Sequence, residues 1–531
     1  MMNRNVFIDF TAKEFNYYNN SLFKDVVEDY LAKNPEVILS EYIIGTDLAR
    51  VYNEVLMNDL RHVKDQRGLY RLIELIYDHW RNFQRYLIAD LSVSYAINPN
   101  NYGQIFTDFN DYVLTSYRNI CTNLLGKKFT VMRELPAGGN AFVLLNKNTN
   151  SVYEALKEVK YISNIIFRPP FVVYSESNKR KGIFPIINES PLNGLEIIND
   201  EWLCYPILVG NSRVAVYFKK RYMSLAMALS NLFEHDDSFA EHKPDMIVLF
   251  GTNTVDGVYY DEEKDLYVAS LVECDEIDYF GYLKKIILTV YNIKMINSGY
   301  LPIHGAGVSL TLKDHRVKNI VLIGDSGAGK SETLEALRTV SNDYILDMKT
   351  IFDDMGTFIL KDDMKAYGTE IGAFVRIDDL ENDYVYRVFD RAIFMNPHQT
   401  NARLVLPVSI HDDIVSGYQI DMFLYANNYD ESEQKIKLFK NKAEALHVFK
   451  EGKRMAKGTT AESGLVETFF ANPFGPVQLQ EKTEILLDAY FDHMFNSNVE
   501  VGQIYTGLGL PDGANNPIKA AVELLAMLKE K

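Results

Sequence analysis

Cysteine is scarce in this chain. Cys121, Cys204 and Cys274 are the only three, and they lie far apart in the sequence. Three widely spaced thiols provide neither a disulfide framework nor the paired cysteines of a zinc site. We therefore expect buried or incidental thiols and a protein that works in a reducing compartment.

Long apolar runs are missing as well. No stretch of about eighteen residues is apolar and free of charge, as a membrane-spanning helix would require. The opening segment, MMNRNVFIDF, lacks the apolar core and the small-residue cleavage site of a secretion signal. These absences predict a cytoplasmic protein with no membrane partner.

An excess of basic residues is the third absence. Lysine and arginine number 55 against 72 aspartates and glutamates, which gives a net charge of -17 at pH 7. Nucleic-acid binding depends on clustered positive charge that releases counterions from phosphates, so the sequence predicts no nucleic-acid partner. With 531 residues, of which 47% are hydrophobic, the chain is long enough for about two to four domains.

Residue patterning changes along the chain. Apolar residues recur at three- and four-residue steps over much of the first part, which predicts a helical N-terminal region over 1–125. This region could bind a protein partner or simply pack against the rest. Short β-rich runs separated by Gly, Asn and Pro predict an α/β middle domain over 126–272, in which the basic cluster 179–181 reads as a solvated loop rather than an anion site. The remainder, 273–531, carries the motifs described next, and the expected fold class is α/β with mixed sheets.

A glycine-rich loop identifies a nucleotide site. An apolar strand pattern at 319–323 runs into a segment that satisfies G-x-x-x-x-G-K-[ST], and a helical pattern follows it. In such a loop the backbone N–H groups surround phosphate oxygens, the lysine places its charge on the terminal phosphates and the serine hydroxyl ligates a metal. A turn that merely caps a helix would not need the Lys-Ser pair. The predicted site for a nucleoside triphosphate and a divalent metal consists of Gly324, Asp325, Ser326, Gly327, Ala328, Gly329, Lys330, Ser331 and Glu332.

Acidic residues that could hold the metal follow the loop. Asp347 ends a short apolar run seventeen residues after Lys330, where a carboxylate at a strand end can face Ser331. Asp353 and Asp354 are alternatives for the same role. All three could instead be turn formers or helix caps, because acidic residues are common at such positions.

Several other polar residues are uninformative singly, but their order along the chain is informative. Taken singly, His304 reads as a structural histidine and Arg403 as an edge-strand arginine. The glycine loop is nevertheless preceded by an ordered set of residues. A tyrosine, a glycine and a lysine pair come first, and a histidine follows nineteen residues beyond the second lysine: Tyr279, Gly281, Lys284, Lys285 and His304. In this combination the chain resembles a divergent, ATP-dependent member of the phosphoenolpyruvate carboxykinase superfamily, and the resemblance implies that family's mononucleotide-binding core.

Segments downstream of the loop extend the resemblance over roughly 274–513. The family's arginine that contacts the transferred phosphate corresponds to Arg403. Further segments resemble the strands after the family's metal-binding aspartate, its adenine-side segment and its closing segments: 352–358, 369–376, 456–462, 472–475 and 504–507. The loop itself is closer to that of HPr kinase/phosphorylase, which shares the nucleotide-binding core but lacks the upstream lysine pair.

The resemblance implies a reaction and its cofactors. A carboxykinase removes carbon dioxide from oxaloacetate and transfers a phosphate of ATP to the resulting enolate, which gives phosphoenolpyruvate and ADP. By resemblance, Lys285, His304 and Asp347 hold a manganese ion, and Ser331 holds a second metal, such as magnesium, carried by the nucleotide. A lysine ligates a metal only when it is neutral, so Lys285 would need a depressed pKa.

The same resemblance assigns the remaining roles. Lys330 and Arg403 balance charge on the moving phosphoryl group, and Tyr279 contacts the carboxylate of the organic acid. The family's N-terminal arginine segment for that carboxylate has no match, and Arg168 and Arg213 are candidate replacements. Two other functions stay open: a P-loop kinase that acts on a protein or a small molecule, and a nucleotide-binding regulator without catalysis.

Overall fold

The computed structural model describes residues 5–10, 21–93, 101–128, 130–131, 137–180, 182–340, 344–377, 388–456, 464–511 and 513–530. Its contacts divide the chain into two compact units. Unit 1 comprises residues 1–148 and 158–171, and unit 2 comprises residues 149–157 and 172–531. Among the described residues, no helix combines the length and the apolar character needed to cross a membrane.

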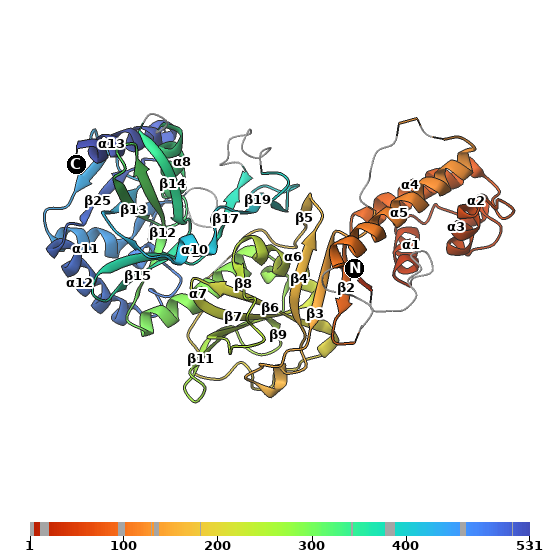
Figure 1. The fold of residues 1–531 in the computed structure, drawn as a ribbon, viewed down its shortest axis with the longest axis horizontal. Helices are drawn as coiled ribbons and strands as arrows, with labels where there is room; N and C mark the ends of the chain where they lie inside the picture. Colours follow the sequence, from red (N-terminus) through yellow and green to blue (C-terminus); the bar gives the residue numbers. More distant parts are fainter. Residues whose placement is uncertain are drawn as a thin grey trace. The chain divides into compact units, whose positions relative to one another are not determined.

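Unit 1 packs helices against strands that follow the order β1-β2-β3-β4 (Figure 1). All neighbours pair in parallel except β3 and β4, which are antiparallel. The strands are β1 (Asn5–Asp9), β2 (Gln84–Asp90), β3 (Ala141–Asn146) and β4 (Tyr161–Phe167). The helices are α1 (Ser21–Lys33), α2 (Leu39–Tyr42), α3 (Leu48–Leu56), α4 (Gln66–Arg81) and α5 (Tyr102–Leu125).

Helix α4 illustrates how the sequence specifies these helices. The Asp65 carboxylate accepts hydrogen bonds from the backbone N–H groups of Arg67 and Gly68, at 3.1 and 3.0 Å, and so caps the first turn. The buried side chains recur at helical spacing and form one apolar face: Leu69, Leu72, Ile73, Ile76, Tyr77 and Trp80.

The expected division of the chain differs from the observed one. The N-terminal region is not purely helical, because β1 and β2 lie within it and every residue of β2 is buried. A short, fully buried strand cannot be told from a helix by its periodicity. The boundary expected after residue 125 is also displaced, since β3 pairs with β2 and brings 126–148 and 158–171 into unit 1.

In unit 2, one set of strands follows the order β6-β7-β9-β11-β10, with β8 beside β6. These strands are β6 (Trp202–Val209), β7 (Ser212–Lys219), β8 (Glu234–His235), β9 (Met246–Thr252), β10 (Gly257–Asp261) and β11 (Leu266–Val272). Helix α6 (Met223–Ala228) contacts β7, and helix α7 (Phe280–Asn297) contacts β9 and β11. Nearly every residue of α7 is buried, so it is a core helix of unit 2.

A mixed sheet of unit 2 carries the glycine loop. Its order is β20-β16-β15-β12-β13-β21-β25-β22, with β14 beside β12, and β13, β21 and β25 are parallel. The strands are β12 (Leu301–Leu312), β13 (Val317–Ile323), β14 (Ile345–Phe352), β15 (Met355–Leu360), β16 (Met364–Gly368), β20 (Tyr418–Gln419), β21 (Met422–Asn427), β22 (Ile436–Leu438) and β25 (Glu500–Tyr505).

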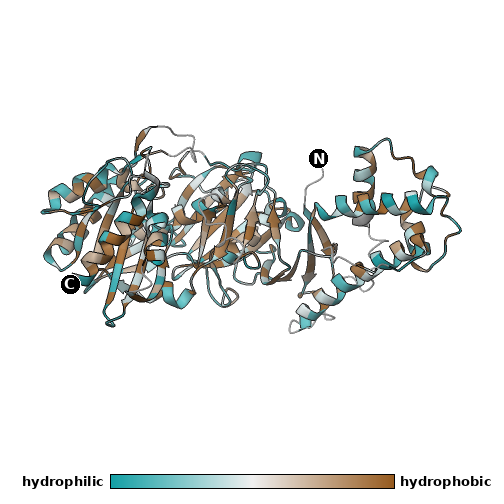
Figure 2. Cartoon of the chain, turned by 90° about the horizontal axis from the view of Figure 1, so that it is seen from above, coloured by the Kyte–Doolittle hydropathy of each residue, from teal (hydrophilic) through white to brown (hydrophobic). Residues whose placement is uncertain are grey.

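Helices cover both faces of this sheet. On one face, Ile320 and Leu322 of β13 are buried in a core with α8 (Lys330–Val340) and α13 (Asn516–Glu530). On the other face, Val321 and Ile323 are buried in a core with α11 (Lys442–Glu451) and α12 (Gln480–Asn496). A strand buried on both faces is apolar at every position, which explains its continuous hydrophobic run. Figure 2 shows the apolar colour concentrated along the strands, whereas the helices carry polar and apolar colours in alternation.

Smaller elements complete unit 2. One small sheet follows the order β17-β19-β18-β5 and another pairs β23 with β24. The elements are β5 (Phe171–Val173), β17 (Gly372–Arg376), β18 (Ile393–Met395), β19 (Arg403–Pro407), α10 (His411–Val415), β23 (Lys453–Met455) and β24 (Leu465–Glu467). The chain is therefore an α/β protein with mixed sheets, as the sequence predicts.

An aromatic cluster under the loop-bearing sheet gives a stability prediction. The fully buried Phe423 ring lies 4.8 Å from Phe449 and 5.1 Å from Phe358, centroid to centroid. Phe423→Ala should lower the free energy of unfolding of unit 2 by about 3–5 kcal/mol, since it leaves a cavity. Ile485→Ala on α12, at a side chain that is 71% exposed, should change it by less than about 0.5 kcal/mol. Urea denaturation of both variants checks this, and equal effects would contradict the assigned packing.

Candidate functional site

The glycine loop links β13 to α8 and is held by two side chains that directly follow β21 and β25. Asn428 Nδ2 donates to the Gly327 carbonyl at 2.9 Å, and Thr506 Oγ1 donates to the Ala328 carbonyl at 2.7 Å. Gly329 has a φ of +94°, and a Cβ there would lie 2.7 Å from Thr506. Only glycine suits this position, because a side chain would be both strained and blocked.

Two charged residues of the loop are buried. Lys330 Nζ donates to the carbonyls of Gly324 and Asp325, at 2.6 and 3.3 Å. The Asp325 carboxylate accepts from Arg454 Nε at 2.9 Å and from the Ser326 N–H at 2.7 Å. Burial opposes ionisation of Asp325, but the Arg454 guanidinium and the Ser326 N–H hold the pKa of its carboxyl below the ordinary range. Asp325 therefore fixes the shape of the loop, while Glu332 lies half-exposed in the first turn of α8.

Three basic side chains converge on Asp354, which lies between β14 and β15. Lys284 and Lys285, both on α7, place Nζ 2.7 and 2.5 Å from its Oδ2. His304, on β12, places Nε2 3.1 Å from its Oδ1. Lys284 also lies 2.8 Å from the buried Glu370, whose other oxygen accepts from the Met355 N–H. The structure thus brings together the lysine pair and the histidine.

The tautomer of His304 follows from its second contact. Its Nδ1 lies 2.8 Å from the Ala471 carbonyl, which can only accept, so Nδ1 carries the proton. Burial lowers the pKa of His304, which favours the neutral ring. Nε2 then presents a lone pair to the ionised Asp354 carboxylate. Two acceptors face each other there, an arrangement that a cation between them would satisfy.

The two adjacent lysines differ in acidity. Burial and the neighbouring charge of Lys284 lower the pKa of Lys285 to about 8, although Asp354 opposes this. Burial acts in the same direction on Lys284, but Asp354 and Glu370 together hold its pKa above the ordinary value. At neutral pH Lys284 is a permanent cation, whereas Lys285 can lose its proton at modest cost.

The donors around Asp354 fit a divalent metal. Among the residues that the structure describes, no group of three or more His, Cys, Asp and Glu side chains could hold a metal ion. The donor set here is of mixed type, namely a lysine amine, an imidazole nitrogen and a carboxylate. The lowered pKa of Lys285 and the lone pair on His304 Nε2 make each a usable ligand, because metals bind the deprotonated forms.

Asp353 lies beside the loop serine. Ser331 Oγ is 3.2 Å from Asp353 Oδ1. Burial and the charges of Asp354 and Glu370 raise the pKa of Asp353 to about 6. The carboxylate that faces Ser331 therefore comes from Asp353.

The structure does not bring Asp347 to this site, which corrects the metal ligand expected first. Asp347 is exposed and pairs with Thr311 on β12, whereas the His304 position pairs with Met355. Thr311 is seven residues beyond His304, which corresponds to roughly 23 Å along a strand. The alternatives Asp353 and Asp354 occupy the expected place.

Tyr279 and Arg403 lie around one aromatic ring with Lys284. The Arg403 guanidinium carbon is 5.0 Å from the Phe374 centroid, and Lys284 Nζ is 5.9 Å from it. The Tyr279 ring lies 6.2 Å from the same ring. Gly281 is required beside Tyr279, since a Cβ there would lie 2.3 Å from the tyrosine ring. Phe374 was not singled out from the sequence, although it lies in the segment 369–376.

A second ring collects two further cations. Lys285 Nζ lies 4.5 Å and the Arg180 guanidinium carbon 4.8 Å from the Phe474 centroid. The sequence favours a solvated loop for the cluster that contains Arg180, yet the structure places this arginine over the same Phe474 ring as Lys285. The two arginines proposed from the sequence have other contacts: Arg168 lies over Phe106 in unit 1, and Arg213 pairs with Asp236.

Of the segments that resemble the family's adenine-side and closing segments, the structure describes some and leaves part of one outside the described residues. Segment 472–475 contributes Phe474, and segment 504–507 contributes Thr506, so both reach the site. Residues 457–462 of the expected adenine-side segment lie outside the described residues.

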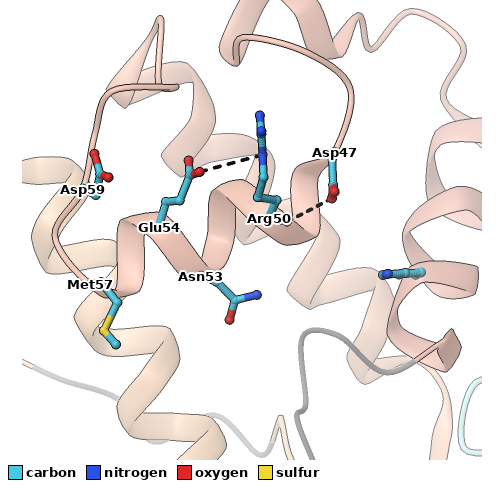
Figure 3. Close-up of a pocket in the computed structure, with 7 residues that line it drawn as sticks. Asp47, Arg50, Asn53, Glu54, Met57 and Asp59 are labelled. Carbon is cyan, nitrogen blue, oxygen red and sulfur yellow. Dashed lines mark hydrogen bonds and ion pairs between the residues drawn. The ribbon is translucent and has the colours of Figure 1, made fainter.

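A shallow hollow in unit 1 is a separate feature (Figure 3). Its volume is about 530 Å³, and Arg50 interacts with two of its acidic residues: Arg50 Nε lies 3.8 Å from Glu54, and Asp47 accepts from the Arg50 N–H. Its lining residues are Lys24, Asp47, Arg50, Asn53, Glu54, Met57 and Asp59.

Comparison of the chain with models of protein families and with curated proteins gives no match.

The acidity of Asp353 gives a prediction with a defined sign. Its pKa is about 6 in the folded protein against an ordinary 3.8, so its proton stabilises the fold in acid, and this contribution is lost as pH rises through 6. With a chelator present, Asp353→Asn should therefore raise the free energy of unfolding by up to about 3 kcal/mol at about pH 7.5 and much less at about pH 4.

Asp347→Asn, at an exposed position of the preceding strand, is the matched control and should change stability little at either pH. Denaturant midpoints of the two variants across this pH range check the prediction. A pH-independent effect of Asp353→Asn would show that its carboxyl is not strained by burial and neighbouring charge.

Proposed function

We propose that this protein is an ATP- and divalent-metal-dependent, phosphoenolpyruvate carboxykinase-like enzyme with that superfamily's nucleotide-binding core, which works in the cytoplasm. In its reaction the bond between C3 and C4 of oxaloacetate breaks, carbon dioxide leaves, and the enolate oxygen attacks the γ-phosphorus of ATP. The products are phosphoenolpyruvate and ADP. The observation that carries the proposal is the convergence of Lys285 and His304 on Asp354, next to the phosphate loop.

The loop residues account for the nucleotide. Lys330 and the N–H groups between Gly324 and Ser331 would bind the phosphates, and the Ser331 hydroxyl would hold the metal that accompanies them. Lys330 lies near both Asp353 and Asp354, which keeps the loop and the lysine pair within one electrostatic site.

Lys285, His304 and Asp354 would hold the second metal, with Asp354 in place of Asp347. Such a cation supplies Lewis-acid stabilisation of the enolate oxygen. Lys284 stays protonated and compensates the Asp354 and Glu370 charges, so that the ligands keep their positions when Lys285 loses its proton.

The organic acid would lie between the two aromatic rings. Tyr279 and Arg403 line the Phe374 side, where Arg403 would meet the transferred phosphoryl group. Arg180 and Lys285 line the Phe474 side. A carboxylate is well suited to a guanidinium, so Arg180 takes the role for which Arg168 and Arg213 were candidates.

One observation favours a second candidate, a P-loop kinase acting on a hydroxyl group. Asp353 has a pKa near 6 and lies beside Ser331, as a general base that accepts the proton of an attacking hydroxyl should. The lysine pair and His304 have no task in that reaction, which makes it the weaker candidate. A regulator without catalysis would not require Lys285 and His304 to share a carboxylate.

The decisive experiment is turnover with manganese, phosphoenolpyruvate, ADP and bicarbonate, with the oxaloacetate formed coupled to malate dehydrogenase. Lys285→Ala should lower kcat by at least about 100-fold, since a metal ligand is lost. Lys294→Ala, on the same helix but paired with Asp245, should retain activity. Absence of turnover in a wild-type protein that still binds ATP would refute the carboxykinase and favour the kinase or the regulator.

Arg180 gives a second test of the substrate. Arg180→Gln should raise KM for phosphoenolpyruvate by about 10- to 100-fold, because a charged hydrogen bond to the carboxylate is lost. KM for ADP should stay within about twofold. Lys179→Gln, at the adjacent exposed residue, is the control. Equal KM values for both variants and wild type would remove Arg180 from the site.

A further inference from the structure

Two arginines lie directly opposite each other on neighbouring strands. Arg376 ends β17, Arg403 begins β19, and the two residues are paired in the antiparallel register. Side chains at paired positions of an antiparallel sheet project from the same face and lie close together. The two guanidinium groups therefore emerge side by side.

The opposite face of this sheet is an ordinary apolar core. Leu404 and Leu406 of β19 are buried in it, with Val375 and Ile377 packed against them. Alternation along the strands directs Phe374, Arg376 and Arg403 to the other face, where all three remain partly exposed. The arginine-bearing face is therefore not closed by the apolar core.

Like charges in directly opposed positions of a sheet repel each other, so the neighbouring guanidinium of Arg376 disfavours the charge of Arg403. Arg403 finds few hydrogen-bond acceptors among the described residues. Its Nη2 donates to Asn401 Oδ1 at 3.2 Å, and its buried Nε has no hydrogen-bond partner among those residues. In the described part of the chain Arg403 forms no ion pair with a carboxylate. A buried guanidinium donor without an acceptor points to an external acceptor.

The surroundings of the pair connect it to the proposed reaction. The Phe374 ring lies 5.0 Å from the Arg403 guanidinium carbon, and Lys284 Nζ and the Tyr279 ring lie 5.9 and 6.2 Å from the same ring. Asn401 is held in turn, since its Nδ2 donates to the Asn178 carbonyl at 2.8 Å, two residues before Arg180. A single hydrogen-bonded chain thus positions Arg403 relative to the loop that carries Arg180.

We propose that Arg376 and Arg403 form a two-guanidinium site that binds an oxyanion, a carboxylate or a phosphate, of the compound that accepts or donates the phosphoryl group. This inference rests on the proposed function for the identity of that compound, but it adds Arg376 as a residue that contacts the ligand. Two parallel forks neutralise a dianion and fix its orientation, which a single arginine cannot do.

The experiment is isothermal titration calorimetry of the full-length protein, with a chelator and without nucleotide. Phosphoenolpyruvate, inorganic phosphate and oxalate are the probes. Arg376→Gln should weaken phosphoenolpyruvate binding by about 10- to 100-fold, as expected for loss of a charge-assisted pair. The probe that weakens in parallel, phosphate or oxalate, identifies which group the arginines hold.

Two variants keep this test interpretable. Arg376→Lys retains the charge but not the fork, so it should bind more weakly than wild type and more tightly than Arg376→Gln. Arg391→Gln replaces an exposed arginine just before β18 of the same sheet and should bind all three probes as wild type does. ATP affinity should be unchanged in every variant.

The outcomes separate this inference from the proposed function. Wild-type binding of every probe by Arg376→Gln, or no binding of any probe by the wild-type protein, overturns the two-arginine site. Loss of binding in Arg376→Gln together with absent carboxykinase turnover in the wild type retains the site and rejects the carboxykinase.

Discussion

The carboxylate of Asp354 is the charge on which the site depends. Burial alone would favour its neutral form, but Lys284 and Lys285 hold its pKa well below the usual range. Its partners come from α7 and β12, so the attraction fixes a helix against an interior strand of the sheet and holds three side chains against one carboxylate. Removing one charged member of this group leaves its partners with uncompensated buried charge, so loss of any one member destabilises the whole arrangement.

Glu370 makes the adjacent lysines chemically different. Lys284 contacts two carboxylates and keeps its proton, whereas Lys285 contacts one and has a pKa lowered to about 8. One backbone segment thus supplies both a fixed cation and a titratable amine. For the proposed reaction this separation matters, because charge balance and metal ligation would otherwise compete for the same group.

The parts of the site that could be predicted from the sequence are local ones. The glycine loop lies within one strand-loop-helix segment, so its residues and their neighbours in the chain suffice to identify it. The choice between Asp347 and Asp354 depends on how β14 and β15 pair with β12, and that register includes an irregularity between Gly307 and Val308. Arg180 and Phe474 meet across nearly three hundred residues, and nothing in either local sequence signals the contact. Strand β2 was missed for another reason, since full burial removes the alternation that marks a strand.

The backbone near His304 has a consequence for proton balance. Phe470 and Ala471 are consecutive buried residues with φ of 53° and 49°, a conformation that costs about 1 kcal/mol or more for each non-glycine residue. This strain directs a peptide carbonyl at the imidazole, where many histidines have a carboxylate. The carbonyl fixes the proton on Nδ1 and burial lowers the pKa of the ring, so Nε2 presents its lone pair to Asp354. The protonation state of the histidine is therefore encoded in main-chain geometry, where a comparison of side-chain identities would not reveal it.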